Sequence, residues 1–203
     1  MINFKMVKDT ECESPRTSFD NVGTMVCVHR RYNLGDDNAK NKLIDEIRNH
    51  KKYTPSLEDK FDFDNIAQLL KVAQKIDLLA IYLPVYLYDH ENLSLNTTGF
   101  SCPWDSGQVG YIYVTKSEFY ENFNVKKLSS KKLSLMKEIL ESEVETYNKY
   151  LNGDVYGFII EDSETEEHIN SCYGFYSSNN FSFIKYFFKA RIELKLIYLI
   201  KYI

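Results

Sequence analysis

The sequence predicts an α+β fold, a single compact domain with a mixed or antiparallel sheet. Three observations lead to this class. Strand and helix patterns follow one another without regular βαβ alternation, a long amphipathic helix is expected over about residues 130–152, and a C-terminal hairpin is expected after it. At 203 residues the chain has the size of one domain. We expect that domain to span residues 1–180.

The first fifty residues predict an irregular arm, a strand and a helix. Residues 1–23 mix charged side chains with turn-forming residues, which is typical of an arm that ends in a turn. Residues 24–29 form a short apolar run that predicts a buried strand. Over residues 37–50 the spacing of the apolar side chains predicts a helix that is capped by Asp37 or Asn38.

The middle of the chain predicts a second helix and two strands. Asp64 is placed to cap the helix. Residues 78–88 are the most apolar stretch of the body, and Pro84 within them indicates an edge strand or a bulge. The segment 89–110 is irregular and contains several glycines, and residues 109–114 predict the next strand.

The last part of the predicted domain is helical and then β. Thr115 and Glu118 form a capping box, so a short helix is expected to start there. The long helix over residues 130–152 follows, with its apolar residues on one face. Residues 155–161 and 168–176 then predict two antiparallel strands joined by an acidic loop.

The final segment, residues 181–203, differs from the rest because it is basic and apolar, with five basic residues against one acidic residue. Charges interrupt it about every four positions, so it lacks the uninterrupted apolar run of a membrane span. It is expected to be a tail or helix that packs on the domain, or a basic amphipathic helix on a partner or a membrane surface.

Composition limits the classes of function. The net charge of -4 argues against a nonspecific nucleic-acid binder, and the acidic residues gather in the first 180 positions. Four scattered cysteines without a CxxC pair predict neither a disulfide framework nor structural zinc. The chain has no Walker loop, GxGxxG, HExxH or GxSxG motif. We therefore expect no metal and no cofactor.

The first candidate cluster lies at the end of the predicted strand 24–29. Cys27 and His29 would share one face of that strand, where they would suit a nucleophile with its base or two metal ligands. Arg30 and Arg31 would suit phosphate, because guanidinium groups match its oxygens. In the simpler alternative, the cysteine is a small core residue and the arginines form ion pairs with Asp36.

The second candidate cluster lies in the segment 89–110. Cys102, His90 and Asp105 are the residues that a small hydrolase of a nucleotide or peptide-like substrate would use, if the thiol came within reach of the imidazole. The alternative is that the loop is structural, with Trp104 anchored in the core. Loops of this kind often bind partners, so the candidate binding residues here are Trp104, Ser106 and Gln108.

The third candidate is the acidic hairpin loop. Its carboxylates would imitate nucleic-acid phosphates, as in inhibitors of nucleic-acid-binding proteins, or would simply be solvated at a hairpin tip. The candidate binding residues are Glu161, Asp162, Glu164 and Glu166.

Two strings support a resemblance to a known family. They are DNVGTMVCVHRRYNLGD at residues 20–36 and FSCPWDSGQVGYIYV at residues 100–114. The chain resembles a family of small proteins encoded by bacteriophages and prophages, over roughly residues 14–176. The family pattern continues into an acidic helix, whereas this chain becomes basic and apolar after Asn179.

The resemblance implies an accessory protein that acts on host machinery. We expect an inhibitor of a bacterial defence system, similar to an anti-CRISPR protein, that binds a host defence protein or effector complex stoichiometrically. Its contact surface would be the acidic face with the loops 29–37 and 89–108, and direct nucleic-acid binding is not expected. The amino terminus has no apolar core of a signal peptide, so we expect the protein in the bacterial cytoplasm. The alternative function is the small hydrolase described above.

Overall fold

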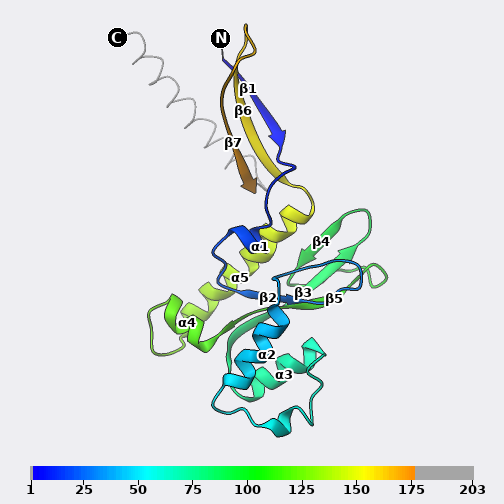
Figure 1. Ribbon diagram of the computed structural model, residues 1–203, viewed down its shortest axis with the longest axis vertical. Coiled ribbons are helices and arrows are strands. Elements are labelled where there is room, and N and C mark those ends of the chain that lie inside the picture. Colours follow the sequence, from blue (N-terminus) through cyan, green and yellow to red (C-terminus); the bar gives the residue numbers. More distant parts are fainter. Residues whose placement is uncertain (1, 177–203) are drawn as a thin grey trace. The chain divides into compact units, whose positions relative to one another are not determined.

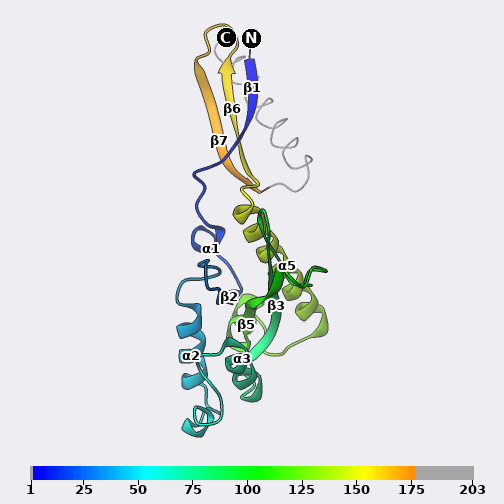
Figure 2. The ribbon, with the colours of Figure 1, turned by 90° about the vertical axis from the view of Figure 1, so that its right-hand side faces the viewer.

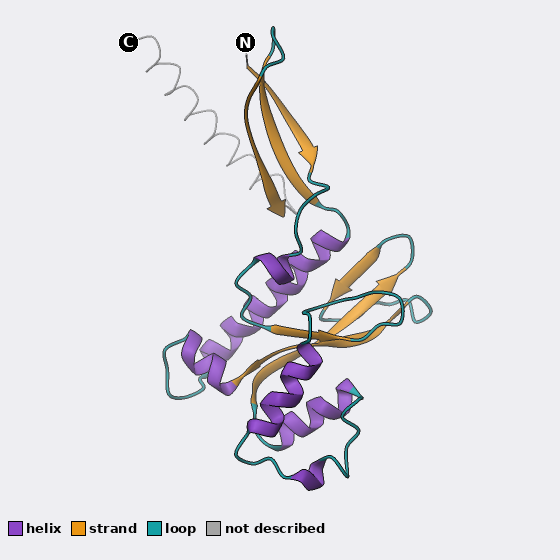
Figure 3. Ribbon diagram, viewed as in Figure 1, coloured by secondary structure: helices purple, strands orange, loops and turns teal. Residues whose placement is uncertain are grey.

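The computed structural model describes residues 2–176, and the expected tail 181–203 lies outside the described residues. The chain forms two compact units. Unit 2 is Ser14–Asn148, and the described part of unit 1 consists of residues 2–13 and 149–176. Helices and two separate antiparallel sheets confirm the predicted α+β class (Figures 1 and 3). The expected domain 1–180 spans both units.

Unit 2 is built on a four-stranded antiparallel sheet in the order β2-β5-β3-β4. Its strands are β2 (Thr24–Cys27), β3 (Leu79–Asp89), β4 (Leu93–Asn96) and β5 (Ser106–Thr115). Pro84 lies where β3 pairs with β5 alone, because β4 starts to pair with β3 only at Tyr86. A register shift follows directly, between Val85 and Tyr86. Both the edge position and the bulge expected for this proline are therefore present.

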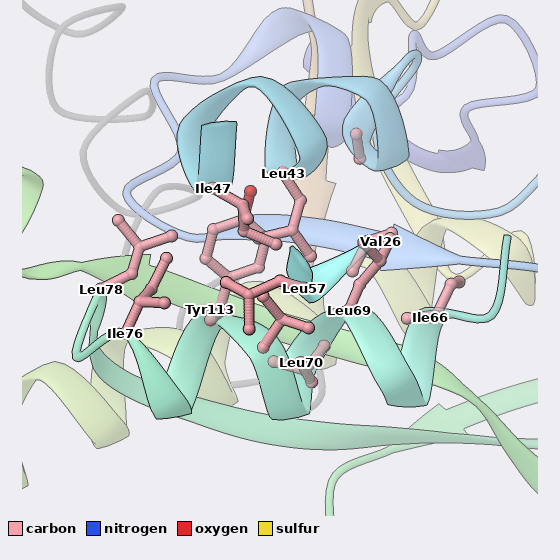
Figure 4. Close-up of a cluster of buried hydrophobic side chains, with 13 residues drawn as sticks. Val26, Leu43, Ile47, Leu57, Ile66, Leu69, Leu70, Ile76, Leu78 and Tyr113 are labelled. Carbon is pink, nitrogen blue, oxygen red and sulfur yellow. The ribbon is translucent and has the colours of Figure 1, made fainter. Parts of the chain in front are cut away.

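Two helices cover one face of this sheet, α2 (Ala39–Asn49) and α3 (Ile66–Lys75), with a short 3-10 turn at Pro55–Leu57 between them. Their apolar faces and the sheet enclose one core, whose labelled side chains are shown in Figure 4 and include Leu43, Leu69 and Tyr113. Asn65, not Asp64, caps α3, since its side chain accepts the N–H of Gln68. Asn38 occupies the N-cap position of α2 without a capping side-chain bond.

The helices α4 (Lys116–Asn122) and α5 (Ser130–Leu151) follow the last strand of the sheet. The capping box is present, with the Thr115 hydroxyl and the Glu118 carboxylate each bonded to the other residue's backbone N–H. Figures 1 and 2 show α5 and the α2–α3 pair on opposite sides of the sheet. A Cβ on Gly23 would meet both Leu140 of α5 and Ile112 of β5, so helix and sheet are in close contact there.

Unit 1 is a three-stranded antiparallel sheet in the order β1-β6-β7. Its strands are β1 (Ile2–Lys8), β6 (Val155–Asp162) and β7 (His168–Tyr176). The expected hairpin is confirmed, but the expectation of an irregular arm over residues 1–23 was wrong. Residues 2–8 pair along the whole of β6, and a short helix, α1 (Pro15–Ser18), follows. The arm becomes a strand because β6, about 150 residues later, offers it an edge.

Among residues 2–176, no helix has both the length and the apolar character needed to cross a membrane.

Candidate functional site

A surface hollow of about 430 Å³ in unit 2 brings together the two loops that the sequence indicates. One wall is the chain that leaves β2, and the other is the start of β5 with the end of β3. We call it the Trp104 hollow. It is lined by Val28, His29, Arg30, Arg31, Leu87, Asp89, Trp104, Asp105, Ser106, Gly107, Gln108 and Val109.

The first wall is held in place by β2. Cys27 is the last residue of β2 opposite Gly110 of β5, and the N–H of Val28 still donates to the carbonyl of Val109 at 2.9 Å. The chain then leaves the ladder and returns at Gly35, which forms a bridge with Val26. The segment between is therefore a loop fixed at both ends, and it presents its side chains beside the start of β5.

Arg31 is fixed within this wall by its neighbours. Its guanidinium forms an ion pair with Asp89, and the Tyr32 hydroxyl donates to the same carboxylate at 3.1 Å. The Tyr32 ring stacks on His29, with ring centroids 5.0 Å apart, and lies 5.4 Å from the Arg31 guanidinium carbon. Asp89 and Tyr32 lie within the two predicted segments but are not among the predicted site residues. Asp89 could have been found from the sequence, because it is an acid that directly follows the predicted strand 78–88 and is complementary in charge to Arg30 and Arg31.

Arg30 differs from Arg31. Its side chain is exposed, and over residues 2–176 it forms no ion pair and no hydrogen bond. The carboxylates of the hollow are already engaged, Asp89 by Arg31 and Asp105 by Cys102 and His90. Arg30 is therefore the cation that the hollow offers to a ligand.

Trp104 is 92% exposed, so the alternative in which it anchors the loop in the core was wrong. The loop is stabilised by other bonds. The Ser106 hydroxyl donates to the Cys102 carbonyl, and the Asn96 side chain bonds to the backbone of Thr98 and Gly99. The loop thus has internal bonds that do not involve the indole. Val28, across the hollow's lining, is also 60% exposed.

Cys102, Asp105 and His90 do lie together, but not in the order that nucleophilic catalysis needs. The Cys102 thiol donates to Asp105 Oδ2 at 3.6 Å, and His90 Nδ1 lies 3.6 Å from the same oxygen. A Cys–His–Asp relay places the imidazole between the thiol and the carboxylate, so that the imidazole can take the thiol proton. Here the carboxylate is in the middle.

Cys27 and His29 do not share a strand face as expected, because β2 ends at Cys27 and His29 stacks on Tyr32 in the loop. Burial raises the pKa of the Cys27 thiol to about 12, so at neutral pH it is protonated and unsuited to act as a nucleophile. Within residues 2–176, no group of three or more histidine, cysteine or acidic residues is arranged to hold a metal ion.

Asp36 lies in an internal network of unit 2 and does not line the hollow. Its carboxylate accepts Arg16 Nε at 2.6 Å and the N–H of Met25 at 2.8 Å. The same guanidinium pairs with Glu143 of α5 at 2.8 Å and donates to the Gly23 carbonyl at 2.6 Å. Asp36 therefore positions the returning end of the loop.

The acidic hairpin residues belong to unit 1, whereas the hollow belongs to unit 2. Glu161 forms an ion pair with Lys5 of β1 at 2.5 Å. Asp162 accepts the N–H groups of Glu164 and Thr165, and these bonds lower its pKa. Glu164 and Glu166 are exposed at the tip. Two of the four predicted carboxylates thus have structural bonds.

Comparison of the chain with protein-family models, with curated proteins and with solved structures found no match.

Proposed function

We propose that this is a phage-encoded accessory protein that inhibits a bacterial defence system, in the manner of an anti-CRISPR protein, by binding a host protein stoichiometrically. The observation that carries the proposal is Trp104, the one tryptophan of the chain, which is 92% exposed and lines a hollow together with the unpaired Arg30. The resemblance of the sequence to phage and prophage proteins supports the choice of a host target.

The energetics favour a protein partner. Tryptophan and arginine are enriched among the few residues that dominate binding energy at protein interfaces. Covering an indole of about 150 Å² removes apolar area worth about 4 kcal/mol from water, before the costs of association. An aromatic side chain at this exposure contributes nothing to the folded core. The unfavourable hydration of the exposed indole is relieved when a partner covers it.

A nucleic-acid ligand is disfavoured by charge. Affinity for nucleic acid grows with the number of phosphates that lysine and arginine neutralise. The hollow offers one free guanidinium, on a chain of net charge -4.

A hydrolase remains the second candidate, because Cys102 and His90 both lie beside Asp105, which lines the hollow. The position of the Asp105 carboxylate between the thiol and the imidazole counts against a hydrolase. The His90 side chain is 59% exposed, so a substrate could reach the imidazole.

The test is an interference assay in host cells that carry an active defence system, combined with capture of the target by tagged protein. We expect Trp104→Ala to lose both protection and capture. The matched control is Leu135→Ala, which removes another exposed apolar side chain of unit 2 that does not line the hollow and should keep both.

The Cys102→Ala/His90→Ala double variant separates the two candidates. If the protein acts by binding alone, the double variant should keep protection. Loss of protection with unchanged capture would favour the hydrolase and contradict the proposal, and so would full protection by Trp104→Ala.

A further inference from the structure

We propose that the Trp104 hollow receives an extended acidic segment of the partner protein. The segment pairs with a free edge of β5, places a carboxylate on Arg30 and covers Trp104 with an apolar side chain. This inference rests on the proposed function and adds the chemistry that the partner must present.

The edge of β5 is available because its two neighbours cover different lengths of it. β3 pairs with β5 from Ser106 onward, whereas β2 pairs only from Gly110 to Tyr113. Over the described residues, the stretch 106–108 thus has a strand on one side only. The face of the strand is also uncrowded there, since a Cβ on Gly107 would meet nothing within 4 Å, so side chains of an added strand would have room.

The direction of the backbone bonds agrees with strand addition. The N–H of Asp89 donates to the carbonyl of Asp105 at 2.8 Å, so the main-chain groups of Asp105 face β3. Successive residues of an antiparallel strand alternate in this respect, so those of Ser106 face the opposite, uncovered edge. An added strand would bond there, as in peptide recognition by strand addition.

Charge complementarity selects an acidic segment. The hollow's two carboxylates are already engaged by its own side chains, which leaves the exposed guanidinium of Arg30. A carboxylate matches a guanidinium with two parallel hydrogen bonds. A basic segment would find no free carboxylate in the hollow.

The apolar requirement comes from two exposed side chains of the same lining, Trp104 at 92% and Val28 at 60%. In an extended segment, alternate side chains face the same side. A partner segment in which apolar residues stand close to an acidic one would therefore meet both the arginine and the indole.

The experiment is selection of a displayed library of random peptides on the immobilised full-length protein. We expect the selected peptides to be enriched in aspartate or glutamate next to a large apolar residue. Selection on Arg30→Gln should lose the acidic enrichment, whereas selection on Arg48→Gln should keep it. Arg48 is a matched control because it lies on α2, outside the hollow, and its guanidinium is also solvent-accessible but is paired with Glu58.

The best selected peptide is then titrated with Trp104 emission as the signal, which reports on the hollow directly because the chain has one tryptophan. Replacing its acid with the amide should weaken binding about tenfold or more in the wild type and leave affinity nearly unchanged in Arg30→Gln. N-methylation of alternate backbone amides should abolish binding if the peptide adds as a strand.

Several results would overturn the inference. They are selected peptides without an acid, an acid preference that survives Arg30→Gln, tighter binding of a single-stranded oligonucleotide than of any peptide, or a concentration-dependent dimer that occupies the hollow with a second copy. If these occur while Trp104→Ala still loses capture of the host protein, the proposed function stands and this inference alone fails.

Discussion

Two arginines of unit 2 have opposite roles, and the difference lies in what surrounds each guanidinium. The Arg16 side chain is 1% exposed and is bonded to Asp36, Glu143, Asn21 and the Gly23 carbonyl. Arg30 is exposed and unpaired among residues 2–176. A buried guanidinium with all its partners stabilises one geometry of the chain, whereas an exposed one retains its capacity to bind a ligand.

Arg16→Met should therefore destabilise unit 2 by about 3 to 5 kcal/mol, because it leaves Asp36 and Glu143 without their shared cation. Urea unfolding followed by circular dichroism measures the change. Arg48→Gln, which breaks a solvent-exposed pair with Glu58, is the control and should change the free energy of unfolding little. Equal decreases in the free energy of unfolding would show that the buried network stabilises unit 2 no more than the exposed ion pair does.

The contribution of Glu118 to stability depends on pH, and the direction of this dependence follows from the contacts of its carboxylate. Burial by itself would raise its pKa, but the N–H of Thr115 and the ammonium group of Lys42 outweigh burial and lower the pKa below its ordinary value. A lowered pKa means that the ionised form stabilises the fold. That contribution is complete above the unfolded pKa and is lost as the pH falls through the folded pKa.

Glu118→Gln removes the charge and keeps an acceptor for the capping box. We expect it to cost about 1 kcal/mol at neutral pH, and the difference from the wild type should shrink as the solution is acidified below about pH 4. Unfolding curves across this range measure it. A difference that grows on acidification would contradict the assignment.

At the scale of elements, β5 joins the core to the candidate site, and its glycines mark the change between the two. At Gly110 a Cβ would lie 2.0 Å from the Val26 carbonyl oxygen and 2.7 Å from the Cys27 Cα, which are both backbone atoms of β2. At Gly107 the same atom would meet nothing within 4 Å. The strand is thus closely packed where β2 pairs with it and open where the hollow begins.

Gly110→Ala should lower the free energy of unfolding by about 2 to 3 kcal/mol, because backbone atoms must move to admit the methyl group. Gly107→Ala on the same strand is the control and should stay within about 0.5 kcal/mol of the wild type. Thermal and urea unfolding of both variants measure the effects. A tolerated alanine at Gly110 would mean that β2 does not lie as close to β5 as described.

The sequence predicted the elements whose signals are local. The Thr115–Glu118 box and the apolar face of residues 130–152 lie within one segment each, and both are confirmed. β1 was missed because its partner lies about 150 residues away, although apolar and polar side chains do alternate over residues 2–6. Asn65 and Asp64 are equally good capping residues, and only the helix start decides between them.

The candidate site was predictable in its residues but not in its arrangement. Two segments singled out by composition, around Arg30 and around Trp104, do line one hollow. Nothing in the order of residues shows that Asp36 turns inward to Arg16, or that the carboxylate of Asp105 comes between Cys102 and His90. Those facts depend on pairing between strands that are far apart in the chain.

In the order of the chain, unit 2 is an insertion between two parts of unit 1. Residues 2–13 and 149–176 form unit 1, in which β1 pairs with β6. The two candidate contact surfaces are divided accordingly, because the Trp104 hollow belongs to unit 2 and the acidic hairpin tip to unit 1. A substitution in one can therefore be made without touching the other's lining residues.

This division allows the two surfaces to be compared against the captured host protein. Trp104→Ala should weaken binding about thirtyfold or more, because an interfacial tryptophan commonly contributes 2 kcal/mol or more. Glu164→Gln/Glu166→Gln should change affinity only a few-fold, mainly through the association rate, since exposed rim charges act by steering. Surface plasmon resonance at low and high salt measures both rates. If the hairpin variant loses more affinity than Trp104→Ala, and wild-type binding falls steeply with salt, the carboxylates of the tip bind the partner in place of phosphates and the hollow is not the main contact.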